Sequence, residues 1–162
     1  MAYDFKGPLW AADATGAPAA LYSPTTRYSG SAGVEAWISS GLPAKKLVLG
    51  VTFYGYAWKL VDPNKHGLGA AASGKSTEEG VDTEGAMKYW QIKEFVSRRE
   101  ATCVFDETVG TDYCYAGSTW IGFDGPKTIA AKVSYARRKE LLGYYAWSMG
   151  GDSNWELSPK GE

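Results

Sequence analysis

The pattern of apolar, aromatic and polar residues along the chain predicts three β-strands, each ending in aromatic and polar residues. The first covers residues 1–5, the second covers 46–54 and leads into the aromatic stretch 53–58, and the third covers 141–147. Residues 46–54 form a run of β-formers without alternation, which is typical of a strand buried on both faces of a parallel sheet. Ligands bind at the carboxyl ends of such strands. The pattern therefore predicts a cleft lined with aromatic side chains.

Apolar residues at helical spacing predict two helices between these strands. One follows a Gly-, Ala- and Pro-rich loop over residues 7–32 and is capped by Ser31. The other has Pro126 in its first turn and Asp124 or Gly125 as its cap. The apolar positions are Val34, Trp37 and Ile38 in the first helix and Ile129, Val133 and Ala136 in the second. Strands and helices in this order predict a parallel βαβ arrangement.

The segment 59–117 differs in composition from the segments on either side, with many glycines and a mixed polar surface. It is therefore predicted to be an insertion. Within it, apolar spacing predicts an amphipathic helix over 85–99. Residues 102–109 and 112–116 are predicted to pair as a hairpin around Gly110. An antiparallel sheet with one helix on it is the simplest structure that these elements can form.

Three parallel strands are too few to close a barrel, since about eight are needed to fill its interior with side chains. The expected α/β architecture is therefore incomplete, with strand edges left unpaired. The predicted division is a partial barrel over 1–58, an α+β insertion over 59–117 and a second part of the barrel over 118–162.

Composition argues against several classes of function. The 162 residues include 17 Lys and Arg and 18 Asp and Glu, giving a net charge of −1 and no basic patch for nucleic acid or anionic membranes. No apolar stretch approaches the ~20 residues of a membrane span. Residues 1–20 lack the features of a signal peptide, so a signal for secretion would lie outside this chain. The 7 Trp and 11 Tyr suit the apolar faces of sugars as well as a core.

The cysteines and the single histidine do not predict a metal site. His66 lies in a polar loop without a ligand set around it, so neither a metal ion nor a cofactor is expected. With the hairpin turn centred near Gly110 and Thr111, Cys103 would pair near Ser118 and not with Cys114. A disulfide would need another register, and free thiols are expected.

Four short motifs resemble glycoside hydrolase family 18, in the same order as in that family. Residues 1–4 (MAYD) resemble the M-x-Y-D stretch of its sixth barrel strand, and residues 49–55 (LGVTFYG) resemble its seventh strand. Residues 119–124 (TWIGFD) resemble the end of its α+β insertion, and 143–148 (GYYAWS) resemble its eighth strand. Residues 41–47 (GLPAKKL) and 53–58 (FYGYAW) resemble plant class V chitinases. The resemblance implies strands six to eight of a TIM (β/α)8 barrel, with the insertion.

The resemblance also implies an activity. Family 18 enzymes hydrolyse β-1,4-linked N-acetylglucosamine: a protonated Glu donates to the leaving oxygen while the acetamido oxygen of the substrate attacks the anomeric carbon. Chitin or its oligosaccharides would be the ligand, with no cofactor, nucleic acid or membrane partner. The family suggests an extracellular or vacuolar location, which this chain by itself does not indicate.

Particular residues match the family's site. By resemblance, the Tyr3 hydroxyl steadies the acetamido group, and Asp4 bonds sugar hydroxyls and the catalytic acid. Trp147 matches the tryptophan that forms the floor under the distorted sugar. Trp10 matches the tryptophan that stacks on the leaving-group sugar, and Met1 matches a methionine that lines the pocket. From local sequence alone, core packing would be the default interpretation of Trp147, and the alternative for Tyr3 and Asp4 is a core tyrosine beside a helix-capping aspartate.

Two further implications concern neighbours of this site. The family often has a cis peptide bond after the floor tryptophan, so Trp147–Ser148 is a candidate for that geometry. Tyr54 is expected to support the top of the barrel and not to contact sugar, and Tyr56 stands where many relatives carry Arg.

One departure from the family affects function directly. The catalytic signature D-x-x-D-x-D-x-E does not occur in the 162 residues, and the acidic segment 78–84 has neither its spacing nor its hydrophobicity. That segment is expected to be a solvated loop. The chain is thus predicted to be the C-terminal part of a chitinase, inactive alone, with residue 1 an internal strand position. The alternatives are a non-catalytic chitinase-like lectin and a truncated product that does not fold alone.

Overall fold

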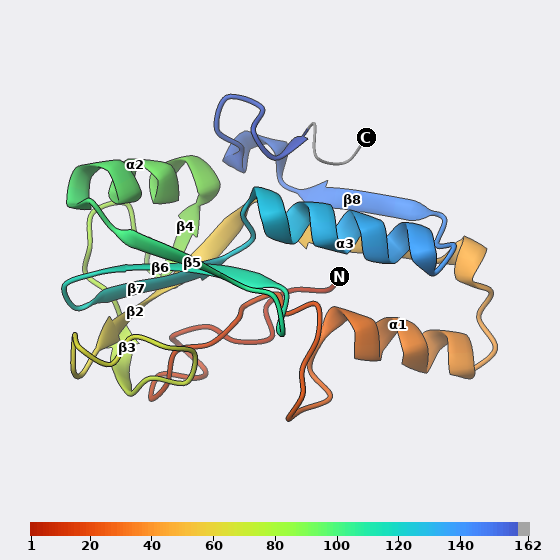
Figure 1. Cartoon of the computed structure of the whole chain (residues 1–162), viewed down its shortest axis with the longest axis horizontal. Helices are drawn as coiled ribbons and strands as arrows, with labels where there is room; N and C mark the ends of the chain where they lie inside the picture. Colours follow the sequence, from red (N-terminus) through yellow and green to blue (C-terminus); the bar gives the residue numbers. More distant parts are fainter. Residues whose placement is uncertain (159–162) are drawn as a thin grey trace.

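The computed structural model describes residues 1–158, so the last four residues of the third predicted segment lie outside it. A two-stranded parallel sheet lies on one side with α1 and α3, and a six-stranded antiparallel sheet lies on the other with α2 (Figure 1). The helices are α1 (Gly30–Ser39), α2 (Tyr89–Arg99) and α3 (Pro126–Arg138), with 3-10 turns at Ala44–Lys46 and Met149–Gly151. The strands are β1 (Val48–Thr52), β2 (Tyr54–Leu60), β3 (Ala72–Lys75), β4 (Ala86–Lys88), β5 (Thr102–Asp106), β6 (Thr111–Ala116), β7 (Thr119–Phe123) and β8 (Gly143–Trp147).

Strands β1 and β8 are parallel, as the sequence predicts. Their register runs from Val48 opposite Gly143 to Thr52 opposite Trp147. Helix α3 begins with Pro126 after Gly125 and buries the predicted stripe of Ile129, Val133 and Ala136. The strand pair and α3 therefore form part of an α/β architecture, and the described residues do not close a barrel.

The expected first strand is wrong, because residues 1–5 join no sheet. Asp4 has a φ of 61°, in the left-handed region, which ends any extended run at that position. Phe5 then turns toward the following loop, where its N–H donates to the carbonyl of Pro18 at 2.8 Å. Tyr3 still lies against β1, since a Cβ added at Gly50 would be 2.9 Å from its ring.

The sequence pattern indicated that residues 54–58 continue from the strand over 46–54. In the structure they form the start of a separate strand, β2. The chain changes sheets at Phe53, whose N–H donates to the Trp147 carbonyl and whose carbonyl accepts from the Tyr89 N–H, each at 2.9 Å. Strand β2 then pairs antiparallel with β3, β4 and β7. Gly55 is required here, since a Cβ would lie 2.2 Å from the Gly122 carbonyl oxygen.

Two helices begin at residues other than those predicted. Ser29, not Ser31, caps α1 by accepting a hydrogen bond from the Ala32 N–H at 3.3 Å. In α1, Val34 is buried while Trp37 is 61% exposed. Helix α2 begins only at Tyr89, because the preceding three residues pair with β2 as strand β4. The antiparallel sheet with one helix is confirmed.

A disulfide joins Cys103 and Cys114, so the expectation of free thiols is wrong. The hairpin turn lies earlier than predicted: Asp106 is opposite Thr111, which places the two cysteines directly opposite each other with Cα atoms 4.1 Å apart. Asp106 sets this turn, since its side chain accepts from the Val109 N–H at 3.0 Å and its carbonyl accepts from the Gly110 N–H at 2.8 Å.

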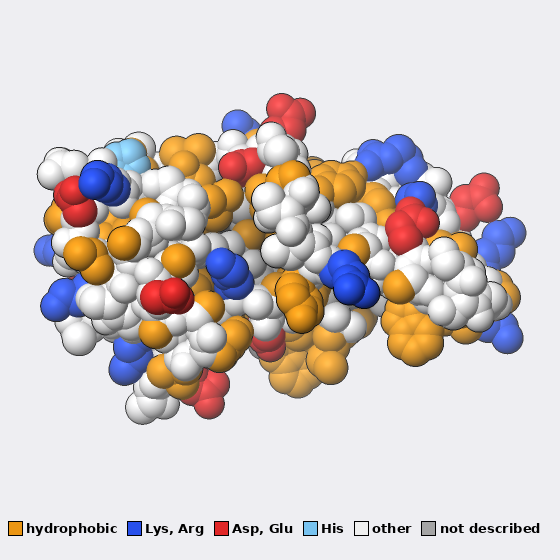
Figure 2. Space-filling view, turned by 90° about the horizontal axis from the view of Figure 1, so that it is seen from below, with side chains coloured by type: hydrophobic (Ala, Val, Ile, Leu, Met, Phe, Trp, Pro, Cys, Tyr) orange, Lys and Arg blue, Asp and Glu red, His pale blue; other side chains and the backbone are white. Residues whose placement is uncertain are grey.

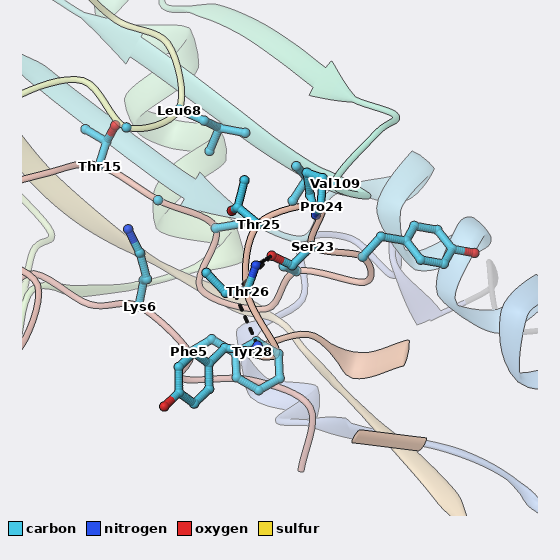
Figure 3. A pocket seen from close by; sticks show the side chains of 15 residues that line it. Phe5, Lys6, Thr15, Ser23, Pro24, Thr25, Thr26, Tyr28, Leu68 and Val109 are labelled. Carbon is cyan, nitrogen blue, oxygen red and sulfur yellow. Dashed lines mark hydrogen bonds between the residues drawn. The ribbon is translucent and has the colours of Figure 1, made fainter. Parts of the chain in front are cut away.

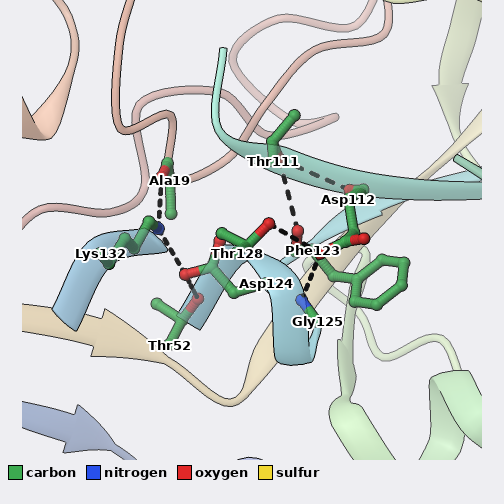
Figure 4. Close-up of polar contacts among 9 residues, drawn as sticks. All are labelled: Ala19, Thr52, Thr111, Asp112, Phe123, Asp124, Gly125, Thr128 and Lys132. Atoms are coloured by element: carbon green, nitrogen blue, oxygen red, sulfur yellow. Dashed lines mark hydrogen bonds and ion pairs between the residues drawn. The ribbon is translucent and has the colours of Figure 1, made fainter. Parts of the chain in front are cut away.

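A buried ion pair joins the two sheets (Figure 4). The Lys132 ammonium on α3 pairs with the Asp124 carboxylate after β7, and both side chains are almost fully buried. Lys132 also donates to the Ala19 carbonyl, and Thr52 at the end of β1 donates to Asp124 at 3.4 Å. Asp112 supports the neighbouring turn by accepting from Thr128 at 2.7 Å. This cluster fixes loop, strand, sheet and helix to one another.

Substituting Lys132 by Met should lower the free energy of unfolding by about 3–5 kcal/mol, because the Asp124 charge would stay buried without its partner. Urea unfolding measures this loss. The control is Lys139→Met, whose partner Glu35 is exposed and which should cost at most about 1 kcal/mol. Equal losses in the two variants would contradict the assigned role of the cluster.

Substituting Cys103 by Ser should lower the free energy of unfolding by about 2–3 kcal/mol, since the disulfide closes a loop with a sequence separation of 11 residues. Urea unfolding with and without a reductant checks this. The reductant should destabilise the native chain and leave Cys103→Ser unchanged. A native chain that is insensitive to complete reduction would show that the cross-link contributes nothing.

Candidate functional site

A cavity of about 450 Å³ opens where the parallel strands end beside the antiparallel sheet. Residues from several segments line it, among them Gly80 and Asp82 of the acidic loop. Asp4 and Trp147 come from the side of the parallel sheet, Tyr54 and Tyr56 come from β2, and Lys88 and Gln91 come from the β4–α2 segment. Two of the predicted site residues, Asp4 and Trp147, are 143 positions apart in the sequence and face the same cavity.

Asp4 accepts two hydrogen bonds through one carboxylate oxygen. The Tyr54 hydroxyl donates to Oδ1 at 2.6 Å, and the Tyr56 hydroxyl donates to the same atom at 3.2 Å. Residues two apart on a strand point to the same face, so both hydroxyls can reach one carboxylate. The two hydrogen bonds to Asp4 were not predicted from the sequence, although the alternation of Tyr54 and Tyr56 on a strand was the available signal.

Tyr3 lies beside this cluster. Its hydroxyl is 3.2 Å from the Tyr145 hydroxyl, and its ring meets the Tyr54 ring edge-on with centroids 6.3 Å apart. Tyr145 is a second partner that the sequence analysis missed. It is two residues before Trp147 on β8, so both side chains lie on the same face of that strand.

The Trp147 indole is 60% exposed at the end of β8, so its surface is available to a ligand. The Trp147–Ser148 peptide bond is cis, which confirms that prediction. The backbone of Trp147 is fixed by the hydrogen bond from Phe53. A half-exposed ring on a fixed strand end is suited to stacking against an apolar ligand face.

Trp10 and Met1 occupy different places. The Trp10 ring is 52% exposed, meets the Tyr56 ring edge-on at 5.3 Å and lies over Gly7, where a Cβ would be 2.4 Å from it. Met1 is 90% exposed and lines a separate groove with Trp37. The structure therefore brings Trp10 to the Asp4 cluster through Tyr56, while Met1 is not among the residues that line the Asp4 cavity.

The phenol groups at the site stay protonated over a wide pH range. Burial, followed by the hydrogen bond to Asp4, raises the pKa of Tyr54 far above its ordinary value near 10. Burial and the Asp4 charge raise the pKa of Tyr56, and burial and the Tyr145 hydrogen bond raise that of Tyr3. All three hydroxyls therefore remain hydrogen-bond donors at neutral pH.

A second cavity, about 310 Å³ in volume, lies under the loop before α1 (Figure 3). Phe5, Lys6, Thr15 and Tyr28 are among its lining residues, and the lining includes no carboxylate. It is smaller than the cavity at Asp4 and contains none of the predicted site residues. The larger cavity is therefore the candidate site.

The acidic segment is a loop, as expected, but it is not simply solvated. The Glu78 side chain is only 12% exposed and pairs with Arg98 at 3.0 Å and Arg99 at 3.4 Å. These ion pairs attach the loop to the end of α2. Glu78 therefore stabilises the position of the loop through these ion pairs, and it does not line the candidate site.

The described residues hold neither a metal cluster nor a membrane-spanning helix. Within residues 1–158, no group of three or more His, Cys, Asp or Glu side chains could hold a metal ion. No helix in that range is long and apolar enough to cross a bilayer. On the face seen in Figure 2, basic and acidic side chains are interspersed with hydrophobic ones.

Comparison with known proteins decides the family. The model of glycosyl hydrolases family 18 matches residues 1–152. The chain belongs to this family. It is 47% identical to a class V chitinase from Arabidopsis thaliana over 159 residues, which is 98% of this chain and 41% of that protein.

Solved structures agree with this assignment. A mutant class V chitinase from Nicotiana tobaccum in complex with NAG4 superposes with a TM-score of 0.96 at 48% identity, covering 99% of this chain and 46% of that one. A chitinase-like agglutinin from Robinia pseudoacacia gives a TM-score of 0.89 at 39% identity, covering 99% and 44%. This family 18 chain thus spans less than half the length of these relatives.

Proposed function

We propose that this chain supplies one side of a cleft that binds β-1,4-linked N-acetylglucosamine oligosaccharides, as the C-terminal part of a chitinase-like protein. The observation that carries the proposal is the Asp4 carboxylate, held by two tyrosines in the same cavity as the half-exposed Trp147. Such a cavity offers an apolar ring for one sugar face and an acceptor for hydroxyls. The NAG4 complex of the tobacco chitinase, with this same fold, supports it.

Each side chain has a role in this proposal. The Trp147 indole stacks under the sugar that reacts, Asp4 accepts from its hydroxyls, and the Tyr3 hydroxyl donates to its acetamido group. In the reaction, the acetamido oxygen attacks the anomeric carbon while an acid protonates the leaving oxygen, and Tyr3 stabilises the charge that develops. Trp10 stacks on the leaving-group sugar, whereas Met1, which lines a separate groove, has no contact assigned to it in this proposal.

The acid itself is the point on which enzyme and lectin differ. The sequence contains no D-x-x-D-x-D-x-E stretch, so the proton donor of the reaction would have to come from another part of the protein. The similarity to a chitinase-like agglutinin favours a second candidate, a sugar-binding protein without hydrolysis. A Glu at the last position of that signature, elsewhere in the protein, favours the enzyme.

Substituting Trp147 by Ala should weaken binding of the N-acetylglucosamine tetramer by at least about fivefold, the scale of one aromatic contact of ~1 kcal/mol. Isothermal titration calorimetry on the 162-residue chain measures this. Trp37→Ala is the matched control, because Trp37 on α1 is 61% exposed and lies outside the cavity. Equal affinities for Trp147→Ala and the native chain would remove the stacking role.

The 162-residue chain alone should not hydrolyse the tetramer, because a missing general acid costs about 10²–10⁴-fold in rate. Release of shorter oligosaccharides, followed by chromatography, tests this expectation. Asp4→Asn serves as the control for a contaminating enzyme. Rapid hydrolysis that Asp4→Asn abolishes would show that the acid lies within these residues.

A further inference from the structure

The two oxygens of the Asp4 carboxylate are in different situations. Oδ1 accepts from both Tyr54 and Tyr56. Within the part of the chain that the structure describes, Oδ2 has no protein hydrogen-bond donor, and Asp4 lines the 450 Å³ cavity. A carboxylate has about four acceptor positions, so a ligand can still find acceptor capacity on Asp4.

The two tyrosines are held far more firmly than the aspartate that they contact. Tyr54 and Tyr56 are on β2, opposite Lys88 and Ala86 of β4. The Tyr54 and Tyr56 rings meet edge-on at 5.8 Å, and Tyr56 is only 5% exposed. Asp4, in contrast, is exposed and belongs to a segment that no sheet holds. Its orientation therefore depends on groups outside its own backbone.

We propose that Tyr54 and Tyr56 are positioning residues, which anchor Oδ1 of Asp4 so that Oδ2 faces the cavity and accepts a hydrogen bond from a sugar hydroxyl. The proposal rests on the proposed function for its ligand. It goes beyond that function because it assigns a positioning role to two residues of β2. It also gives the two oxygens of one carboxylate different roles, since Oδ1 is anchored by the tyrosines and Oδ2 accepts from the sugar. An acceptor oriented in advance does not have to be immobilised when the sugar binds.

Replacing each tyrosine by phenylalanine tests this directly, because the ring packing is kept and only the hydroxyl is removed. In the double variant Tyr54→Phe/Tyr56→Phe, Asp4 should rotate between side-chain conformers. Three-bond NMR coupling constants across χ1 of Asp4 should report one conformer in the native chain and an average in the variant. Affinity for the N-acetylglucosamine tetramer should fall about three- to tenfold, because the Asp4 side chain of the variant would have to be immobilised when the sugar binds.

The matched control is Tyr113→Phe/Tyr115→Phe, because these tyrosines have the same two-residue spacing on β6 and do not line the cavity. This variant should keep both the native Asp4 couplings and the native affinity. The coupling measurement needs no ligand, so it separates the positioning role from sugar binding. Thermal unfolding of all three chains checks that each variant is folded.

Each outcome decides a different point. Averaged Asp4 couplings together with weaker tetramer binding support the proposal. Native couplings in Tyr54→Phe/Tyr56→Phe overturn it, as does unchanged affinity with averaged couplings, since Asp4 would then not need to be positioned for sugar. If the native chain does not bind the tetramer while the couplings average, the proposed function fails and the anchoring of Asp4 by the tyrosines stands.

Discussion

The ammonium group of Lys132 joins the parts of the chain that form the cleft. It pairs with Asp124 at the end of the antiparallel sheet, bonds the loop at Ala19, and through Asp124 is linked to Thr52 at the end of β1. A buried charge requires close partners, because leaving it unpaired costs several kcal/mol. The cluster therefore fixes the distance between the two sheets, and Trp147 on β8 and the two tyrosines on β2 line the cleft from different sheets.

The site follows from that arrangement. At Phe53 the chain leaves the parallel sheet and enters the antiparallel one, so Trp147 at the end of β8 and the two tyrosines at the start of β2 come to lie around one cavity. The alternation of side chains along β2 then directs both tyrosine hydroxyls to Asp4. A family 18 fold thus builds an aromatic and acidic surface from residues that are far apart in the sequence.

Much of this could be predicted from the sequence, because helical spacing of apolar residues marks α3 and continuous apolar runs mark β1 and β8. The aromatic cleft was predicted from the residues at the strand ends, and the cis bond at Trp147 was predicted from the resemblance of motifs. The errors have local causes. A two-residue shift of the turn at Asp106 concealed the Cys103–Cys114 disulfide, and a left-handed residue, Asp4, ended the expected first strand. Neither a turn register nor a backbone dihedral is visible in hydrophobic spacing.

The central claim is that the oligosaccharide binds at the end of β8, against the rings around Asp4. Fluorine NMR of the chain labelled with 5-fluorotryptophan tests it most directly, since the seven tryptophans report on separate regions. On titration with the N-acetylglucosamine tetramer, the resonances of Trp147 and Trp10 should shift while those of Trp37 and Trp155 stay in place. Shifts confined to Trp37 or Trp155 would place the sugar elsewhere and contradict the account.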